Sequence, residues 1–419
     1  MCEFDCERHV NPKPSRPHRG VASSQTARAI NREIILETIH RRQPVSRADL
    51  ARLTGLQAST VSLIIGQLID EGWVSPGTLG RLPRGRRPTF VTMNEQHVAL
   101  AADLRPTRAN VGIVDVNGKI LRRETIQFTA QDMGRPDAKR TIAAIARAAA
   151  PMKAAFKGRL IESLGISVSG RVDQGAHKLV FAPHAPWRQP DLEAEFEKTF
   201  KAPAVMENAA NASLFAERWW GNLGDFRNML AISVSDGLGA GILLDGHLVR
   251  GREGMAGEFG HMPLENSGPV CGCGNVGCWE NFAANRAGLR YYNELGGGRE
   301  LADFQQLLDL AVAGDIRALR ALEKMAANLA RGLAMLVAGL APEVVIIVGD
   351  CTAVWPRISP IIESELIAKS FTSRIPRIVP AIDGDAARLR GAAALALYKT
   401  MFRHAAFEQL EQNHVRRPA

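Results

Sequence analysis

The stretch GHMPLENSGPVCGCGNVGCWE, residues 260–280, is the most informative part of the chain. It brings one imidazole and three thiols together on turns rich in glycine: His261, Cys271, Cys273 and Cys278. One neutral imidazole and three thiolates make a complete tetrahedral ligand set for Zn²⁺, and a complete set leaves no open position for a substrate. The cluster therefore predicts a structural zinc site. A disulfide with a spare thiol, or turn cysteines without a ligand, is the alternative.

The same region resembles the signature of the ROK family. Two motifs carry the resemblance: G-x-x-G-x-A-G-E-x-G-H at 251–261 and C-x-C-G-x-x-G-C-x-E at 271–280. That family contains sugar kinases and sugar-responsive repressors, so the resemblance implies one of these functions. It also implies an α/β fold, actin-like or hexokinase-like, with two lobes around a cleft. The resemblance covers roughly residues 25–400.

The composition suits a large protein with more than one buried core. The chain has 419 residues, 46% of them hydrophobic, which suggests two or three domains. The formal charge is +9, and residues 1–97 hold 14 Lys and Arg against 9 Asp and Glu. This excess favours a polyanionic partner, although a solvated basic surface fits the charge equally well. We expect a cytoplasmic protein without membrane insertion, because neither a signal peptide nor a long uncharged apolar run is evident.

The N-terminal part has the pattern of a winged helix-turn-helix. Residues 1–22 are rich in Pro, Arg and His and lack periodicity, so we expect a disordered tail. Three helical patterns follow from about residue 31, and two strand-like segments then flank an Arg-rich loop. The second pattern begins with a capping box between Ser46 and Asp49, and a glycine permits the turn to the third. We assign a winged helix-turn-helix domain to residues 23–95.

In such a module the second helix of the motif enters the major groove of DNA. The third helical pattern keeps short polar side chains off its apolar stripe, where they can reach phosphates and base edges. The loop RLPRGRRP at 81–88 holds four arginines and no acid, which favours a narrow minor groove. The predicted DNA contacts are Gln57, Ser59, Thr60, Ser62, Gln67, Arg84, Arg86 and Arg87. The alternative is a small three-helix interaction module with a solvated loop.

From residue 96 the pattern changes to alternating strands and helices. Three strand runs within 98–128 open a first α/β round, and the run NMLAISVSDGLGAGILLDGHLV at 228–249 opens a second. This duplicated theme agrees with the two lobes that the ROK resemblance implies. We therefore assign residues 96–419 to a sugar-kinase-like domain for ligand binding and oligomerisation. The strand EVVIIVGD and a helix over 386–402 close it.

Two departures from the motifs of ROK kinases argue against phosphoryl transfer. Where the resemblance implies a glycine-rich phosphate loop, this chain has Arg105 and Pro106, and proline has no amide to donate. Where it implies a general-base aspartate after Glu-Asn, this chain has Ala209, which cannot accept a proton. A second glycine-rich loop at 235–241 serves equally well as a tight strand connection. We expect no enzymatic activity.

The resemblance also implies a sugar site. Carboxylates and amides suit the hydroxyl pairs of a sugar. The implied ligand-binding residues are Ser169, Gly170, Asn208, Glu258, His261 and Glu280. His261 would bind zinc through one ring nitrogen and face the ligand with the other. Alternatively, the two glutamates only support the zinc loop.

Together these features predict a transcriptional regulator, a repressor of carbohydrate-metabolism genes that responds to a sugar or a sugar derivative. We expect a homodimer or homotetramer that reads palindromic operator DNA with two recognition helices. The sugar would shift the balance between lobe arrangements. One alternative is a sugar kinase with an appended DNA-binding domain. The other is a ligand-independent DNA-binding protein whose degenerate cleft only stabilises the dimer or docks a protein partner. The helix over 386–402 and the tail after it could serve such a partner.

Overall fold

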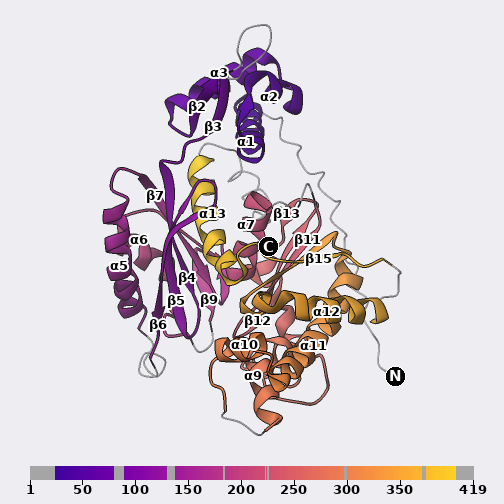
Figure 1. Cartoon of the computed structure of the whole chain (residues 1–419). Coiled ribbons are helices and arrows are strands. Elements are labelled where there is room, and N and C mark those ends of the chain that lie inside the picture. Colours follow the sequence, from indigo (N-terminus) through magenta and orange to yellow (C-terminus); the bar gives the residue numbers. More distant parts are fainter. Residues whose placement is uncertain are drawn as a thin grey trace, which may run out of the picture.

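The computed structural model of the protein describes residues 24–79, 89–129, 137–182, 185–221, 223, 226–296, 300–369 and 374–402. The disordered tail predicted for residues 1–22 lies outside these ranges, and so do the predicted wing contacts Arg84, Arg86 and Arg87. Figure 1 shows two α/β lobes beside each other, with the N-terminal helices and a small sheet above them. The predicted mixed α/β architecture with two lobes is confirmed. No helix in the described ranges is both long and apolar enough to span a lipid bilayer.

The first lobe is built on a five-stranded sheet in the order β10-β7-β4-β5-β6. Its strands are β4 (His97–Leu104), β5 (Arg108–Asp115), β6 (Ile120–Gln127), β7 (Leu160–Val168) and β10 (Ala204–Asn208). A hairpin of β8 (Arg171–Asp173) and β9 (Lys178–Phe181) follows β7. One face of the sheet packs on the helices α5 (Ala138–Ala155) and α6 (Leu192–Phe200). The other face packs on α7 (Ala209–Trp220) and α13 (Ala387–Met401).

The second lobe is built on a sheet in the order β13-β12-β11-β14-β15. Its strands are β11 (Met229–Val234), β12 (Leu238–Leu244), β13 (His247–Leu248), β14 (Val344–Val348) and β15 (Arg377–Pro380). Its largest core lies between this sheet and a set of helices. These are α8 (Glu280–Ala283), α9 (Asn285–Glu294), α10 (Phe304–Val312), α11 (Ile316–Leu340) and α12 (Trp355–Lys369).

The two sheets repeat one topology. In the first lobe β4 pairs antiparallel with β5 and parallel with β7. In the second lobe β11 pairs antiparallel with β12 and parallel with β14. The duplicated theme predicted from the sequence is therefore confirmed.

The smaller N-terminal part contains the helices α1 (Ser24–Arg42), α2 (Arg47–Thr54) and α3 (Ala58–Asp70) and the strands β1 (Val45–Ser46), β2 (Val74–Leu79) and β3 (Thr89–Met93). The strands pair in the order β1-β3-β2. The helix α1 begins before the predicted start at residue 31. The strand β1 was not predicted, because two residues are too few to show a strand period.

Ser46 ends β1 and caps α2. Its hydroxyl accepts a hydrogen bond from the backbone N–H of Asp49 at 3.1 Å and donates to the Asp49 carboxylate at 2.7 Å. In a full capping box the carboxylate accepts from the backbone N–H of the cap residue instead. The predicted capping box is therefore formed only in part. Gly55, with a φ of 72°, makes the predicted turn to α3 in the left-handed region.

The N-terminal part shares its hydrophobic core with the first lobe. Apolar side chains of α1, α2 and α3 are buried in one cluster with side chains of α7 and α13. The ring of His40 in α1 lies 4.8 Å from that of Trp219 in α7, measured between centroids. The hydroxyl of Tyr398 in α13 donates a hydrogen bond to Glu33 in α1. The carboxyl-terminal ends of α7 and α13 therefore support the N-terminal part directly.

The helix α13 corrects one expectation. The helix over 386–402 and the tail after it were a candidate surface for a protein partner. The tail lies outside the described residues, and nearly all side chains of the helix are buried. A Cβ on Gly391 would lie 2.0 Å from the carbonyl oxygen of Ala212 in α7, and a Cβ on Gly165 in β7 would lie 1.9 Å from that of Ala392. These glycines let α13 lie directly on α7 and β7, so the helix belongs to the core.

Gly391→Ala should lower the free energy of unfolding by about 1–3 kcal/mol or more, because the added methyl group meets a backbone carbonyl. Gly339→Ala is the matched control, since Gly339 is exposed in α11 and a Cβ there would have nothing within 4 Å. That change should stabilise the helix by about 0.5–1 kcal/mol. Urea unfolding measures both effects, and equal stability of the two variants would contradict the close packing of α13.

Candidate functional site

A cavity of about 630 Å³ lies between the two lobes, and residues of both lobes line it. Ser169, Gly170 and Asn208 come from the first lobe, and Glu258, His261 and Glu280 come from the second. The structure thus brings all six predicted ligand-binding residues to one cavity. The charged side chains Arg171 and Arg388 also line it, and the sequence analysis missed both.

The four predicted metal ligands lie together at one side of this cavity. The ligand atoms of His261, Cys271, Cys273 and Cys278 are all within 4.8 Å of one another. The Sγ atoms of Cys273 and Cys278 are 3.7 Å apart, whereas a disulfide bond is about 2.05 Å long. With Zn–S bonds of about 2.3 Å, two thiolates of a tetrahedral site lie about 3.8 Å apart. The donor set and its spacing therefore fit a tetrahedral metal ion.

The loop that carries the cysteines is anchored in the second lobe. The indole of Trp279 is fully buried, and its Nε1 donates a hydrogen bond to the carbonyl oxygen of Asn328 in α11 at 2.9 Å. Gly277, with a φ of 73°, allows the turn before Cys278, and a Cβ there would lie 1.9 Å from the carbonyl oxygen of Glu265. The cysteine side chains are thus held by a buried indole and a turn that requires glycine.

The imidazole of His261 lies between the cysteine cluster and the cavity. Its Nδ1 is 3.5 Å from the Sγ of Cys271, and its Nε2 is 3.5 Å from the carboxylate of Glu258. This geometry leaves Nδ1 for a metal and directs Nε2 to the cavity side, as the prediction of two roles requires. Burial raises the pKa of Glu258, although the charges of His261 and Arg171 act in the opposite direction.

Two of the predicted sugar contacts are already engaged in the protein. The carboxylate of Glu280 lies 3.0 Å from the Sγ of Cys271 and accepts a hydrogen bond from the backbone N–H of Leu238 at 3.4 Å, which fits support of the predicted zinc loop. The side chain of Asn208 caps α7, where its oxygen accepts from the amide of Ala210, and its Nδ2 donates to Gly170 at 2.9 Å. One N–H of Asn208 is left for a ligand.

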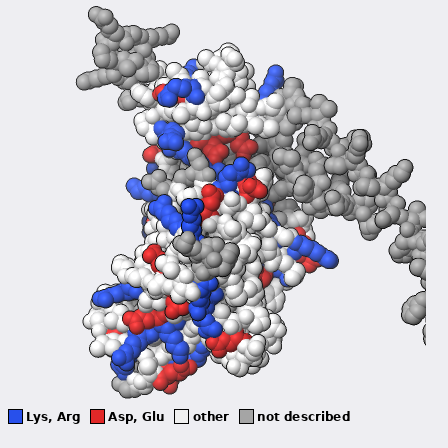
Figure 2. Space-filling model, turned by 90° about the vertical axis from the view of Figure 1, so that its right-hand side faces the viewer, with Lys and Arg blue, Asp and Glu red and all other residues white. Residues whose placement is uncertain are grey.

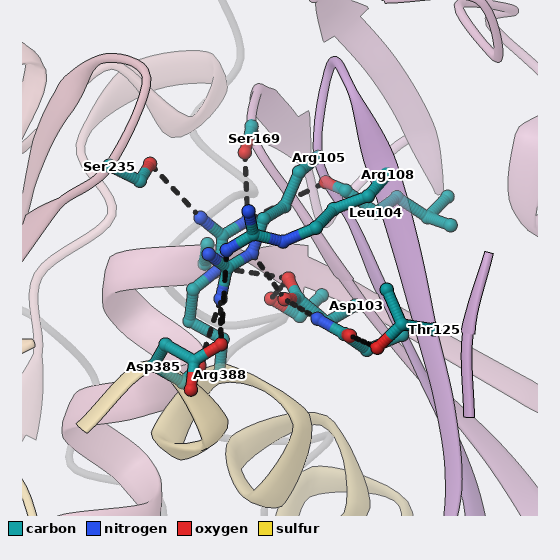
Figure 3. A network of polar contacts seen from close by, with 12 residues as sticks. Asp103, Leu104, Arg105, Arg108, Thr125, Ser169, Ser235, Asp385 and Arg388 are labelled. Carbon is teal, nitrogen blue, oxygen red and sulfur yellow. Dashed lines mark hydrogen bonds and ion pairs between the residues drawn. The ribbon is translucent and has the colours of Figure 1, made fainter. Parts of the chain in front are cut away.

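Arg105, which stands where the resemblance implies a glycine of the phosphate loop, is buried. The Arg105 side chain is 2% exposed, and its Nε lies 2.8 Å from the carboxylate of Asp103. Its terminal nitrogens lie 3.6 Å from Asp350 in the second lobe and 3.3 Å from Asp385 before α13. Figure 3 shows Asp103, Arg105, Asp385 and Arg388 of this network together. The loop therefore binds the protein's own carboxylates, and Ala209, which also lines the cavity, adds no base.

In the N-terminal part, α3 presents one polar face to solvent. Its side chains Val61, Ile64, Ile65 and Leu68 are buried, and Ser59, Ser62 and Gln67 are exposed, as is Gln57 just before the helix. Thr60 is only half-buried. Leu63, which the sequence analysis did not single out, is 63% exposed on the same face. The predicted contacts Ser59, Ser62 and Gln67 thus face outward, and Thr60 lies at the edge of the buried side.

A two-lobed α/β fold with a cavity between the lobes and a cluster of cysteines and histidine at its side defines a class of sugar-kinase-like proteins. The family model described as "ROK family" matches residues 99–399. The chain belongs to the ROK family.

Both transcriptional regulators and sugar kinases occur among the proteins that this chain resembles. The chain is 29% identical over 355 residues to the xylose repressor of Bacillus subtilis (strain 168), a match that covers 84% of this chain and 90% of that one. The structure of a ROK family transcriptional regulator, a homolog of the E. coli MLC protein, matches with a TM-score of 0.72 at 23% identity, over 90% of this chain and 98% of that chain. The structure of a ROK family glucokinase from Streptomyces griseus, in complex with glucose and AMPPNP, matches with a TM-score of 0.64 at 30% identity. That match covers 72% of this chain and 99% of the glucokinase chain.

Proposed function

We propose that the protein is a DNA-binding transcriptional regulator, a repressor of carbohydrate-metabolism genes that responds to a sugar or a sugar derivative. The match to the xylose repressor carries this proposal, because its 355 residues exceed the ROK segment at 99–399 and span 90% of that repressor. The glucokinase match spans 72% of this chain. The proposed function therefore accounts for the N-terminal part as well as for the cavity.

Residues 23–95 form the proposed winged helix-turn-helix domain, with α3 as the recognition helix and residues 96–419 as the ligand-binding domain. The exposed face of α3 supports this assignment, since a helix in the major groove reads bases with outward side chains. Figure 2 shows basic and acidic side chains interleaved over the lower half of the visible face. The exposed side chains of α3 and the arginines at 81–88 of the sequence are the features that favour DNA binding.

The regulator is proposed to have no kinase activity. The backbone N–H of Arg105 donates to the carbonyl oxygen of Arg108 at 2.9 Å, and Pro106 has no N–H, so these two positions present no free amide to a nucleotide. Ala209 cannot orient an attacking hydroxyl. Zinc, bound by His261 and the three cysteines, is proposed to be structural and would supply no chemistry beyond holding their loop.

Sugar binding can reach the DNA-binding domain through two helices. Asn208 caps the amino-terminal end of α7 at the cavity, and Arg388 lies at the corresponding end of α13. The opposite ends of both helices contact α1 through Trp219 and Tyr398. A ligand that binds one lobe arrangement better than the other would therefore shift the position of α1.

Fluorescence anisotropy tests this function. The probe is the promoter region upstream of the protein's own gene, measured at two salt concentrations and then titrated with sugars and sugar phosphates. Tight and salt-sensitive binding that one sugar relieves is the expected result. A homodimer or homotetramer should bind a palindrome in this region. Tight binding that no sugar changes would contradict ligand control, and release of ADP from ATP and a hexose would contradict the absence of kinase activity.

Gln67→Ala should weaken operator binding roughly 5- to 150-fold, since a lost base contact costs about 1–3 kcal/mol. Gln67 is exposed on α3 beside Leu63. Gln306→Ala is the matched control, because Gln306 is an exposed glutamine on α10 in the second lobe. Anisotropy with the same probe measures both variants. Equal affinities of the two variants would exclude Gln67 from the DNA interface.

A further inference from the structure

One wall of the cavity is formed by a buried arginine and two serines. Arg388 is 1% exposed and lines the cavity together with Ser169 and Ser235. Its guanidinium donates hydrogen bonds to the Oγ of Ser169 at 2.7 Å and to the Oγ of Ser235 at 3.3 Å (Figure 3). Because each hydroxyl accepts from the arginine, its own proton is free to be donated to a ligand. The wall thus presents donors from both lobes.

The positive charge of Arg388 is only partly neutralised. Its Nε lies 2.8 Å from Asp103, but Asp103 is shared with the Nε of Arg105, which is also 2.8 Å away. Asp350 and Asp385 serve Arg105, and they also pair with Arg108 and Arg123, so four arginines share three aspartates in this network. Burial lowers the pKa of Arg388 and the charge of Arg105 adds to this effect, whereas the charges of Asp103 and of Asp236, which also lines the cavity, oppose it. Within the buried network the wall therefore combines donors with one more arginine than aspartates.

The acids that line the same cavity have partners of their own. Glu280 accepts a hydrogen bond from the backbone N–H of Leu238 at 3.4 Å, and Asp350 accepts from the guanidinium of Arg108 at 3.2 Å. Asp236 lies 3.4 Å from the hydroxyl of Thr107. Two more acids line the cavity: Glu258 lies 3.5 Å from the Nε2 of His261, and Asp303 caps α10 by accepting from the backbone N–H of Gln305 at 3.0 Å.

Two further features suit an anion. Ala209 lines the cavity next to Asn208, and the methyl side chain of Ala209 brings no charge to this part of the wall. The Nδ2 of Asn208 donates a hydrogen bond to the carbonyl oxygen of Gly170. Arg171 also lines the cavity, and its Nε is buried without a hydrogen-bond partner among the described residues. A buried guanidinium nitrogen without an acceptor is expensive unless a ligand or water supplies one.

We propose that the ligand of this cavity is a sugar that carries an anionic group, a phosphate ester or a carboxylate, which Arg388, Ser169 and Ser235 bind. The inference rests on the proposed function and specifies the chemical class of its effector. Charge-assisted hydrogen bonds from a buried guanidinium make such a group a strong contact. The hydroxyls of the sugar would then face Asn208, Glu258 and His261.

Calorimetric titration of the zinc-loaded full chain tests the inference with matched ligands. The probes are glucose, glucose 6-phosphate and glucuronate, then mannose, mannose 6-phosphate and mannuronate, with inorganic phosphate as the anion alone. At least one anionic sugar should bind tenfold or more tightly than its neutral parent, and the two anionic arms distinguish a phosphate ester from a carboxylate. Neutral sugars that bind as tightly as their anionic forms would overturn the inference, and so would the failure of every probe.

Ala209→Asp provides the variant test, because it places a carboxylate in the cavity at the start of α7, where an acid is compatible with the helix. The variant should bind the anionic sugar, or inorganic phosphate, at least tenfold more weakly than the wild type, and Ala209→Ser should not. An equal loss in both variants would assign the effect to shape and overturn the role of charge. Operator binding by the sugar-free variants reports their folding. Failure of the anion test with intact operator binding leaves the DNA-binding function standing, whereas loss of operator binding by the wild type would contradict that function itself.

Discussion

Cys273→Ser is expected to abolish zinc binding and to lower the stability of the second lobe by several kcal/mol. Serine is not deprotonated at neutral pH and cannot replace a thiolate ligand, so only His261 and two cysteines remain. Structural zinc sites in small peptides contribute about 10–16 kcal/mol of binding energy to folding, and a whole domain is stable by only about 5–15 kcal/mol. Losing part of the zinc contribution is therefore a large effect.

Metal content per chain and thermal unfolding with and without a chelator measure this effect. The chelator should lower the unfolding temperature of the wild type and leave that of Cys273→Ser unchanged. Val270→Ser is the control on the same loop, because its side chain is 73% exposed and is not a ligand. A Cys273→Ser protein that retained one zinc ion and the wild-type unfolding temperature would refute the structural role of the cluster.

Asp103→Asn is expected to lower the free energy of unfolding by about 3–5 kcal/mol at pH 7, since removing one member of a buried charge network leaves the others unpaired. Asp103 is fully buried, and it lies 2.8 Å from the Nε of Arg105 and 2.8 Å from the Nε of Arg388. Asparagine keeps the shape and loses the charge. The two arginines would then face each other with less compensation.

The pH dependence of this difference follows from the pKa of Asp103. Burial alone would raise that pKa, but the charges of Arg388 and Arg105 outweigh burial and hold the pKa at about 2. A depressed pKa in the folded state means that the ionised carboxylate stabilises the fold above about pH 4, the usual aspartate value, and that this stabilisation fades as the pH falls toward 2. The difference between the wild type and Asp103→Asn should therefore shrink between about pH 4 and pH 2.

Chemical unfolding at several pH values provides the measurement. Asp245→Asn is the matched control, because its side chain is 84% exposed and Asn tolerates its positive φ of 51°. That variant should change stability by less than about 0.5 kcal/mol. An Asp103→Asn protein as stable as this control would show that the buried network contributes nothing.

Local patterns in the sequence predicted the parts of the molecule that depend on nearby residues. The cysteine cluster, the turn at Gly55 and the buried stripe of α3 all follow from residues that are neighbours in the chain. The partners of Arg105 could not be predicted, because Asp350 and Asp385 come from distant segments. Arg388 meets Asp103 across 285 positions. No spacing rule connects residues so far apart.

The error over α13 has a related cause. A helix that is buried on every side is usually apolar all round, but α13 carries Arg388 and Arg390, whose buried side chains pair with Asp103 and Asp383. Only the approach of Gly391 to Ala212 shows that α7 covers it. Arg171 and Leu63 were missed because a single arginine or leucine carries no spacing signal. The structure identifies Arg171 by a buried Nε without a hydrogen-bond partner among the described residues, and Leu63 by its exposed side chain.

The core shared by α1, α7 and α13 limits where this chain can be joined to segments of its relatives in a chimera. A chimera joined near residue 96 would separate His40 from Trp219 and Glu33 from Tyr398, and would expose apolar surface on both pieces. The exchangeable unit is therefore the N-terminal part together with the carboxyl-terminal ends of α7 and α13. Engineers who wish to connect this cavity to a new operator need to graft that composite surface, or to confine changes to the solvent face of α3.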